Sequence, residues 1–267
     1  MPYGVGVKRE PAPADYAGCP VTVIDALASG RPLKAPRWGL WDVLIALAIA
    51  FGATVMFAAS LAVWRLVAGT DPPMGVVILV GVTVPWIGLA GWPLIVTAWR
   101  GNGPRIDLGL RLRWLDVGWG VAAGLVALVL AGLAAAATTL IDDSVTSSAA
   151  EIAAQLQKEA GRLSVVVFAL VVVLGAPFVE EIFFRGLLFA ALRKRGVSTV
   201  WTIAITSVGF AAFHLEPMRF LILLPTGVVL GWVRWRTGSL GAAMVAHGVV
   251  NAPGAVSLLL GAPGVTP

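Results

Sequence analysis

The sequence has few charged residues, one cysteine and two histidines, and these scarcities narrow the classes of protein that it can encode. Only 12% of the 267 residues are charged while 58% are hydrophobic, which excludes an ordinary soluble domain. The single cysteine, Cys19, excludes an intramolecular disulfide and a cysteine-based metal cluster. Residues 1–38 contain no apolar core of a signal peptide, so we expect no signal peptide here. The composition instead predicts a multi-pass membrane protein.

Long apolar runs recur along the chain, and each is about 20 residues long, as the hydrocarbon core of a bilayer requires. We predict an all-α bundle of about seven membrane-spanning helices, at residues 43–64, 74–99, 117–141, 163–192, 197–215, 218–233 and 240–260. The sixth span is short and contains Pro225, so we expect it to be tilted, broken or partly re-entrant. The expected organisation has four parts: a polar tail (1–38), accessory spans with a basic loop (39–113), a membrane core (114–262) and a C-terminal tail (263–267).

The Lys and Arg residues outside the spans alternate between the two sides of the membrane. If the N-terminus is cytoplasmic, fourteen of them lie in inner segments and four in outer ones, which is a positive-inside pattern. The net charge of +5 therefore reflects topology, and no aromatic-interleaved basic patch indicates nucleic acid binding. We expect an outer C-terminus and, from the Ala-, Gly- and Arg-rich composition, a bacterial plasma membrane. The bilayer is the predicted partner, and the sequence does not define an oligomeric state.

Two patterns predict local packing away from the charged residues. Between the third and fourth spans, Ile152 and Leu156 share one helical face, which predicts a short surface helix lying on the headgroups. In the third span, Gly120 and Gly124 lie four residues apart among alanines, a spacing typical of closely packed membrane helices.

Charged residues inside a predicted span are the strongest indication of function. Glu180, Glu181 and Arg185 lie in residues 163–192, where an unpaired charge costs roughly 3 kcal/mol or more. Residues four apart share a helical face, so Glu181 is expected to pair with Arg185. Glu180 is turned about 100° away and is expected to point into a cavity. A purely structural ion pair would leave Glu180 unexplained.

Both histidines also lie in apolar spans. Phe210 and His214 are four residues apart, and His247 and Asn251 have the same spacing, so each pair occupies one helical face. A lone histidine in a span commonly makes a hydrogen bond between helices. The confinement of both histidines, an asparagine and an unpaired glutamate to three spans instead indicates a functional site.

Together these residues resemble a known family. The resemblance rests on three motifs in the family's order: Glu180-Glu181-x-x-x-Arg185, Phe210-x-x-x-His214 and His247-x-x-x-Asn251. They are similar to the motifs of the CAAX-prenyl-protease and bacteriocin-processing family of intramembrane glutamate endopeptidases, also called the Abi family. The resemblance covers roughly residues 115–260. It implies an all-helical membrane core that hydrolyses a peptide bond of a membrane-associated or lipidated peptide or protein.

The resemblance also implies a role for each motif residue. By matching position, Glu180 and His214 would hold and deprotonate a water, while His247 and Asn251 would stabilise the tetrahedral oxyanion. The other motif residues would support these four: Glu181, Arg185 and Phe210. The physics agrees, because a carboxylate shielded from bulk water is a stronger base and because amide and imidazole N–H groups are suitable oxyanion donors. The scheme requires no metal, no other cofactor and no Ser or Cys nucleophile.

Two alternatives use the same residues. Two histidines and a glutamate are also zinc ligands in metalloproteases, although the usual His-Glu-x-x-His helix is absent from the sequence. The cluster would also serve an ion- or proton-coupled transporter or a non-catalytic immunity or scaffold protein. Counting the helical rise from the inner charges places Glu180 about 20 Å from Arg193. This depth favours a site that opens to the extracytoplasmic side.

Overall fold

The computed structural model describes residues 30, 33–138, 140, 148–159 and 161–260, and within these ranges every regular element is a helix. In chain order, with α for α-helices and η for π-helices, the elements are α2 (Leu40–Ala68), α3 (Met74–Thr83), η2 (Ile87–Gly91), α4 (Trp92–Arg100), α5 (Pro104–Asp107), α6 (Trp114–Thr138), α7 (Ser148–Glu159), α8 (Arg162–Leu170), η3 (Val171–Gly175), α9 (Ala176–Glu181), η4 (Ile182–Leu188), α10 (Phe189–Lys194), α11 (Thr199–Phe213), α12 (Pro217–Thr237) and α13 (Leu240–Leu260). The predicted all-α class is confirmed.

Six helical stretches are long and apolar enough to cross a membrane. They are Leu40–Ala68, Met74–Arg100, Trp114–Thr138, Arg162–Lys194, Pro217–Thr237 and Leu240–Leu260. The seventh predicted span is α11, an apolar helix of 15 residues. Of the three outcomes expected at Pro225, a tilt, a break or a partial re-entry, the break is wrong, because α12 is a continuous helix of 21 residues that contains this proline. The proline sits inside the helix at the cost of one missing backbone N–H.

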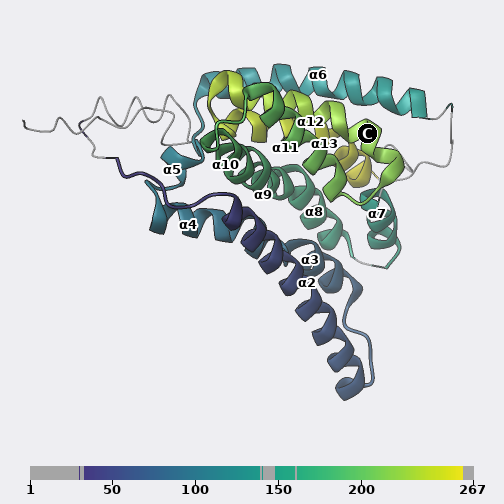
Figure 1. Ribbon diagram of the computed structural model, residues 1–267. Helices are drawn as coiled ribbons and strands as arrows, with labels where there is room; N and C mark the ends of the chain where they lie inside the picture. The colour runs from purple at the N-terminus through teal and green to yellow at the C-terminus, as the bar shows by residue number, and fades with distance from the viewer. Residues whose placement is uncertain (1–29, 31–32, 139, 141–147, 160, 261–267) are drawn as a thin grey trace, which may run out of the picture.

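The helix α6 lies along one edge of the bundle and packs along both α12 and α13, while α11 lies beside α12 (Figure 1). Small residues make this contact close, as predicted. A Cβ atom on Gly120 would lie 2.6 Å from Val245, and one on Gly124 would lie 2.6 Å from Val249. Because these valines flank His247 on α13, the two glycines fix the height and distance of the helix that carries this histidine.

The helix α2 diverges from the rest of the bundle along its second half (Figure 1). Its first half packs against η2, where a Cβ atom on Gly88 would lie 2.3 Å from the carbonyl oxygen of Ala46. The apolar side chains of its second half, such as Met56 and Leu66, are exposed on the protein surface. In a membrane protein this surface faces lipid, so the divergence leaves an extended apolar face for the bilayer.

The helix α7 confirms the predicted helix between the third and fourth spans, while its position on the headgroups stays a prediction. Leu156 is fully buried and belongs to a cluster with Phe168 of α8 and Leu258 of α13. Gln157 Nε2 also donates to the Leu258 carbonyl at 2.9 Å. One face of α7 is therefore docked on the bundle, because burying Leu156 removes its apolar surface from water.

Candidate active site

The motif glutamates sit in a long helix that changes its hydrogen-bond register twice. Glu181 ends α9, and Arg185 lies within the π-helix η4, while a second π-helix, η3, precedes α9. Pro177 at the start of α9 has no N–H to donate, and π-helical segments commonly accommodate such an interruption at functional sites. The register changes rotate the following residues and thereby set the direction in which the two glutamates point.

Glu181 and Arg185 form the predicted pair one helical turn apart. Arg185 Nη1 donates to Glu181 Oε1 at 3.0 Å, and both side chains are fully buried. Arg185 Nη2 donates to the Gly227 carbonyl of α12 at 2.9 Å, and the guanidinium lies 4.6 Å from the centre of the Phe210 ring. The buried cation is thus balanced by a carboxylate, a carbonyl and an aromatic face, which offsets its desolvation. These contacts tie α9, η4, α11 and α12 together.

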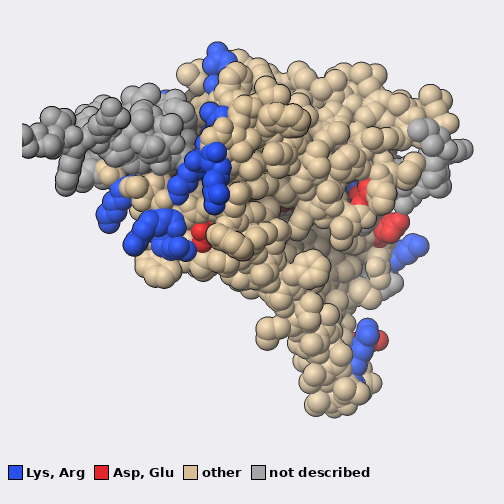
Figure 2. All heavy atoms as spheres, viewed as in Figure 1, with Lys and Arg blue, Asp and Glu red and all other residues tan. Residues whose placement is uncertain are grey.

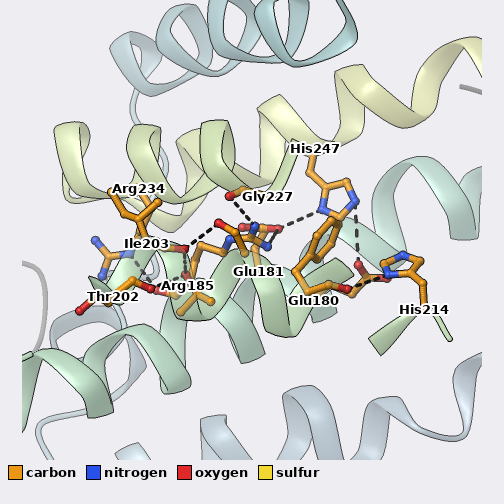
Figure 3. A network of polar contacts seen from close by, with 12 residues as sticks. Glu180, Glu181, Arg185, Thr202, Ile203, His214, Gly227, Arg234 and His247 are labelled. Carbon is orange, nitrogen blue, oxygen red and sulfur yellow. Dashed lines mark hydrogen bonds and ion pairs between the residues drawn. The ribbon is translucent and has the colours of Figure 1, made fainter. Parts of the chain in front are cut away.

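His247 of α13 completes this network and was not expected to do so. Its Nδ1 lies 3.0 Å from Glu181 Oε1, the same oxygen that Arg185 contacts. A carboxylate oxygen only accepts, so Nδ1 carries the proton of this hydrogen bond. In the neutral ring Nε2 is then an acceptor, and it lies 3.9 Å from Glu180 Oε2. Glu181 therefore determines the tautomer and orientation of His247 (Figure 3).

Glu180 has a different environment from its neighbour. Its side chain is 18% exposed, whereas that of Glu181 is fully buried. Within the described part of the chain, the buried oxygens Glu180 Oε2 and Glu181 Oε2 both have no hydrogen-bond partner, but Glu181 contacts Arg185 and His247 through its other oxygen. A buried polar atom without a partner is uncommon in folded proteins and is often a group that binds a ligand. The two adjacent glutamates thus divide into one that is neutralised by Arg185 and one that is available for chemistry.

His214 lies at the end of α11, one residue beyond its last helical turn. Its Nδ1 donates to the Phe210 carbonyl at 2.9 Å, and its ring meets the Phe210 ring edge-on at 5.0 Å. In Figure 3, Glu180 lies between His247 and His214. Among the described residues no hydrogen bond or ion pair joins His214 to Glu180. The histidine that contacts this carboxylate is His247. Phe210 contacts both histidine rings and packs between them.

Asn251 contacts the backbone at the register change before α9. Its Nδ2 donates to the Val172 carbonyl at 2.9 Å. In η3 the bonds run from residue i to i+5, as between Val171 and Ala176, so the natural partner of Val172 would be Pro177. Proline has no N–H, and Asn251 supplies the missing donor. This hydrogen bond uses one of the two amide hydrogens and fixes α13 against η3.

Arg234 is part of the site's support, although its place in the sequence suggested a loop residue at the inner end of a span. The side chain is buried on α12. Its Nε donates to the Arg185 carbonyl and its Nη2 to the Leu108 carbonyl, each at 3.0 Å. Arg234 therefore holds the backbone of η4 from the side opposite to Glu181 (Figure 3). In the sequence, Arg234 lies six residues before the start of the next span. A cation at such a position is typical of the positive-inside pattern, so nothing in the sequence indicated a buried role.

The zinc alternative needs three or more ligands around one point. Across residues 33–138, 148–159 and 161–260, no three His, Cys, Asp or Glu side chains meet in such an arrangement.

The geometry agrees with a comparison against known families. Residues 162–253 match the family model described as Rce1-like, type II CAAX prenyl endopeptidase. The match covers roughly a third of the chain and contains all three motifs. Searches of curated proteins and of solved structures found no match. The segment therefore matches a CAAX-protease family model, in agreement with the resemblance of its motifs. Its six helices that are long and apolar enough to cross a membrane make the protein an integral multi-pass membrane protein, and residues 162–253 of it are similar to CAAX-type proteases.

Proposed function

We propose that the protein is an intramembrane endopeptidase that hydrolyses a peptide bond of a membrane-associated or lipidated substrate with a water activated by Glu180. The observation that carries this proposal is the unpartnered oxygen Glu180 Oε2, which lies 3.9 Å from His247 Nε2. This separation is too long for a direct hydrogen bond. A water molecule placed slightly to one side of the line between these two atoms would be within hydrogen-bond distance of both.

Glu180 acts as the general base in this scheme. It takes a proton from the water as the water oxygen forms a bond to the carbonyl carbon of the substrate. It then gives that proton to the leaving nitrogen as the C–N bond breaks, so protons balance and the carboxylate is restored. The family motif implies that His214 also contacts this water, beside Glu180 and His247. The negative charge of the adjacent Glu181 does not prevent Glu180 from acting as a base, because Arg185 neutralises that charge.

His247 and Asn251 stabilise the oxyanion of the tetrahedral intermediate. His247 Nε2 donates a hydrogen bond when the ring carries a second proton, with Nδ1–H held by Glu181. Asn251 contributes the amide hydrogen that does not bind Val172. Donors fixed in advance are effective because they need no reorganisation as charge develops. The contacts to Glu181 and Val172 provide this fixation.

The substrate is first sought by comparing membrane and secreted peptides of cells with and without the gene. The test is then cleavage of this substrate by the purified protein reconstituted in liposomes. Glu180→Gln is expected to abolish cleavage, because an amide cannot accept the proton of water. Asp71→Asn is the matched control, since it removes one carboxylate from an exposed surface pair with Arg65. A transporter or scaffold would show no cleavage in the wild type. Retained cleavage by Glu180→Gln would refute the mechanism.

A further inference from the structure

A cavity of about 340 Å³ lies where the start of α2 meets the ends of α4 and α10. Four cationic side chains line it: Arg37, Arg100, Lys194 and Arg195. Among the described residues that line it, Asp42 is the only acidic one. The cavity is at the end of the bundle where Lys and Arg side chains gather on the surface (Figure 2), which is the predicted cytoplasmic end. Its wall therefore carries a clear excess of positive charge.

Two of the four cations are already used by the fold. Arg100 Nη1 lies 3.3 Å from Asp42 Oδ1, and the other oxygen of Asp42 accepts from the Gly39 N–H at 2.8 Å. Lys194 Nζ donates to the carbonyls of Pro36 and Trp38. The single acidic residue is thus occupied by Arg100 and the start of α2. It does not neutralise the rest of the wall.

The other two cations, Arg37 and Arg195, have exposed side chains. Within the described residues, neither side chain makes a hydrogen bond or an ion pair. They approach the cavity from two segments far apart in sequence, one just before α2 and one just after α10. Guanidinium groups that converge in this way suit the oxygens of a phosphate, which they bind through charge-assisted hydrogen bonds. The nearby N-terminus of α2 also favours an anion.

The rim of the cavity is apolar on the side of α2. Trp41 lines the cavity and is 74% exposed, and Leu44, one turn further along α2, is 54% exposed. Tryptophan at this level is typical of the boundary between headgroups and hydrocarbon. A ligand with a phosphate in the cavity therefore has an apolar helix face beside it for attached acyl chains. A soluble phosphate would leave this face unused.

We propose that this cavity binds the phosphate headgroup of an anionic phospholipid in the leaflet at the basic end of the bundle. Basic pockets between membrane helices on the cytoplasmic side commonly bind such headgroups. Arg37 and Arg195 contact the phosphate, Lys194 and Arg100 add long-range attraction, and the acyl chains lie along Trp41 and Leu44. The bound lipid bridges α2 and α10, and α10 continues the helix that carries Glu180.

The experiment measures lipid adducts by native mass spectrometry of the full-length protein in detergent, with dioleoyl phosphatidylglycerol and dioleoyl phosphatidylcholine as probes. We expect preferential binding of phosphatidylglycerol by the wild type. The double variant Arg37→Gln/Arg195→Gln should bind it about 30-fold more weakly, since each nearby cation contributes about fivefold. Binding of phosphatidylcholine should not change.

The matched control is Arg105→Gln/Arg193→Gln, which removes the same charge from exposed positions at the same end but outside the cavity. We expect it to weaken binding by less than threefold. An equal loss in both variants would refute the site, because it would indicate diffuse attraction to the basic surface. Glycerol phosphate is added as a soluble competitor. Displacement of the lipid at equal concentration would overturn the lipid assignment in favour of a soluble phosphate ligand. Equal melting temperatures without added lipid would show that all variants are folded.

Discussion

His247 Nδ1 lies 3.0 Å from Glu181 Oε1, so a glutamate whose sequence position indicated only a partner for Arg185 also orients the candidate catalytic histidine. The two roles are compatible because both groups donate to one oxygen of a fully buried carboxylate. Carboxylates that fix the tautomer of a functional histidine occur in metal sites and in catalytic triads. Here the fixed ring directs Nε2 toward Glu180.

The two adjacent glutamates should respond differently to the same substitution. Glu181→Gln should lower stability by about 3–5 kcal/mol, because it removes the charge that balances buried Arg185. Glu180→Gln should change stability by less than about 1 kcal/mol, because Glu180 Oε2 has no hydrogen-bond partner among the described residues. Membrane accumulation and thermal unfolding in detergent would measure both. Equal accumulation with equal loss of cleavage would contradict this division and make both carboxylates catalytic.

Arg234 provides a test of the support behind the site. Arg234→Met should destabilise the protein by about 2–4 kcal/mol, because the carbonyls of Arg185 and Leu108 each lose a buried donor. Arg236→Met is the matched control two residues away. The Arg236 side chain is exposed and lies over the face of Trp119. This substitution should cost less than about 1 kcal/mol. Thermal unfolding of both variants would distinguish them, and similar losses would show that the two carbonyls do not depend on Arg234.

Because α6 and α13 are in close contact, a methyl group added to α6 is expected to affect the site through the movement of α13. Gly124→Ala places a Cβ atom 2.6 Å from Val249 and 2.8 Å from the Ala246 carbonyl, so α13 must move. We expect a stability loss of about 1–3 kcal/mol and reduced cleavage, because α13 carries His247. Gly132→Ala, on the same helix with nothing within 4 Å, should be neutral or slightly stabilising. Reduced cleavage in Gly132→Ala as well would attribute the effect to α6 itself.

The contacts that the sequence predicted are those set by spacing along one helix or by residue size. The Glu181–Arg185 pair follows from the separation of four residues, and the close packing of α6 follows from its glycines, although the sequence did not identify α13 as the partner. The contacts that it missed join distant segments. His247 lies 66 residues from Glu181, and Arg234 lies 49 residues from the carbonyl that it binds. Such contacts depend on how the helices cross and rotate, which periodicity does not determine.

The π-helices are the other part that the sequence did not reveal. Nothing in the spacing of residues indicated a change to i+5 hydrogen bonds on either side of the glutamates. Asn251 compensates for the N–H that Pro177 lacks, but the sequence indicated for it only a role in stabilising the oxyanion. The structure shows that one of its amide hydrogens binds the Val172 carbonyl, which a proline leaves without a donor. The residue therefore has a structural contact that precedes any catalytic one.

The side from which the site opens gives the final prediction. His214 ends α11 beside Leu215, which is 84% exposed and has a positive φ of 55°, uncommon for leucine and often found at functional sites. The positive-inside pattern places this turn outside and Arg195 inside. In a Cys19→Ser background, Leu215→Cys should react with a membrane-impermeant thiol reagent in intact cells. The control, Arg195→Cys, also at an exposed position, should react only in inverted vesicles. The reverse pattern would place the opening beside His214 on the cytoplasmic side.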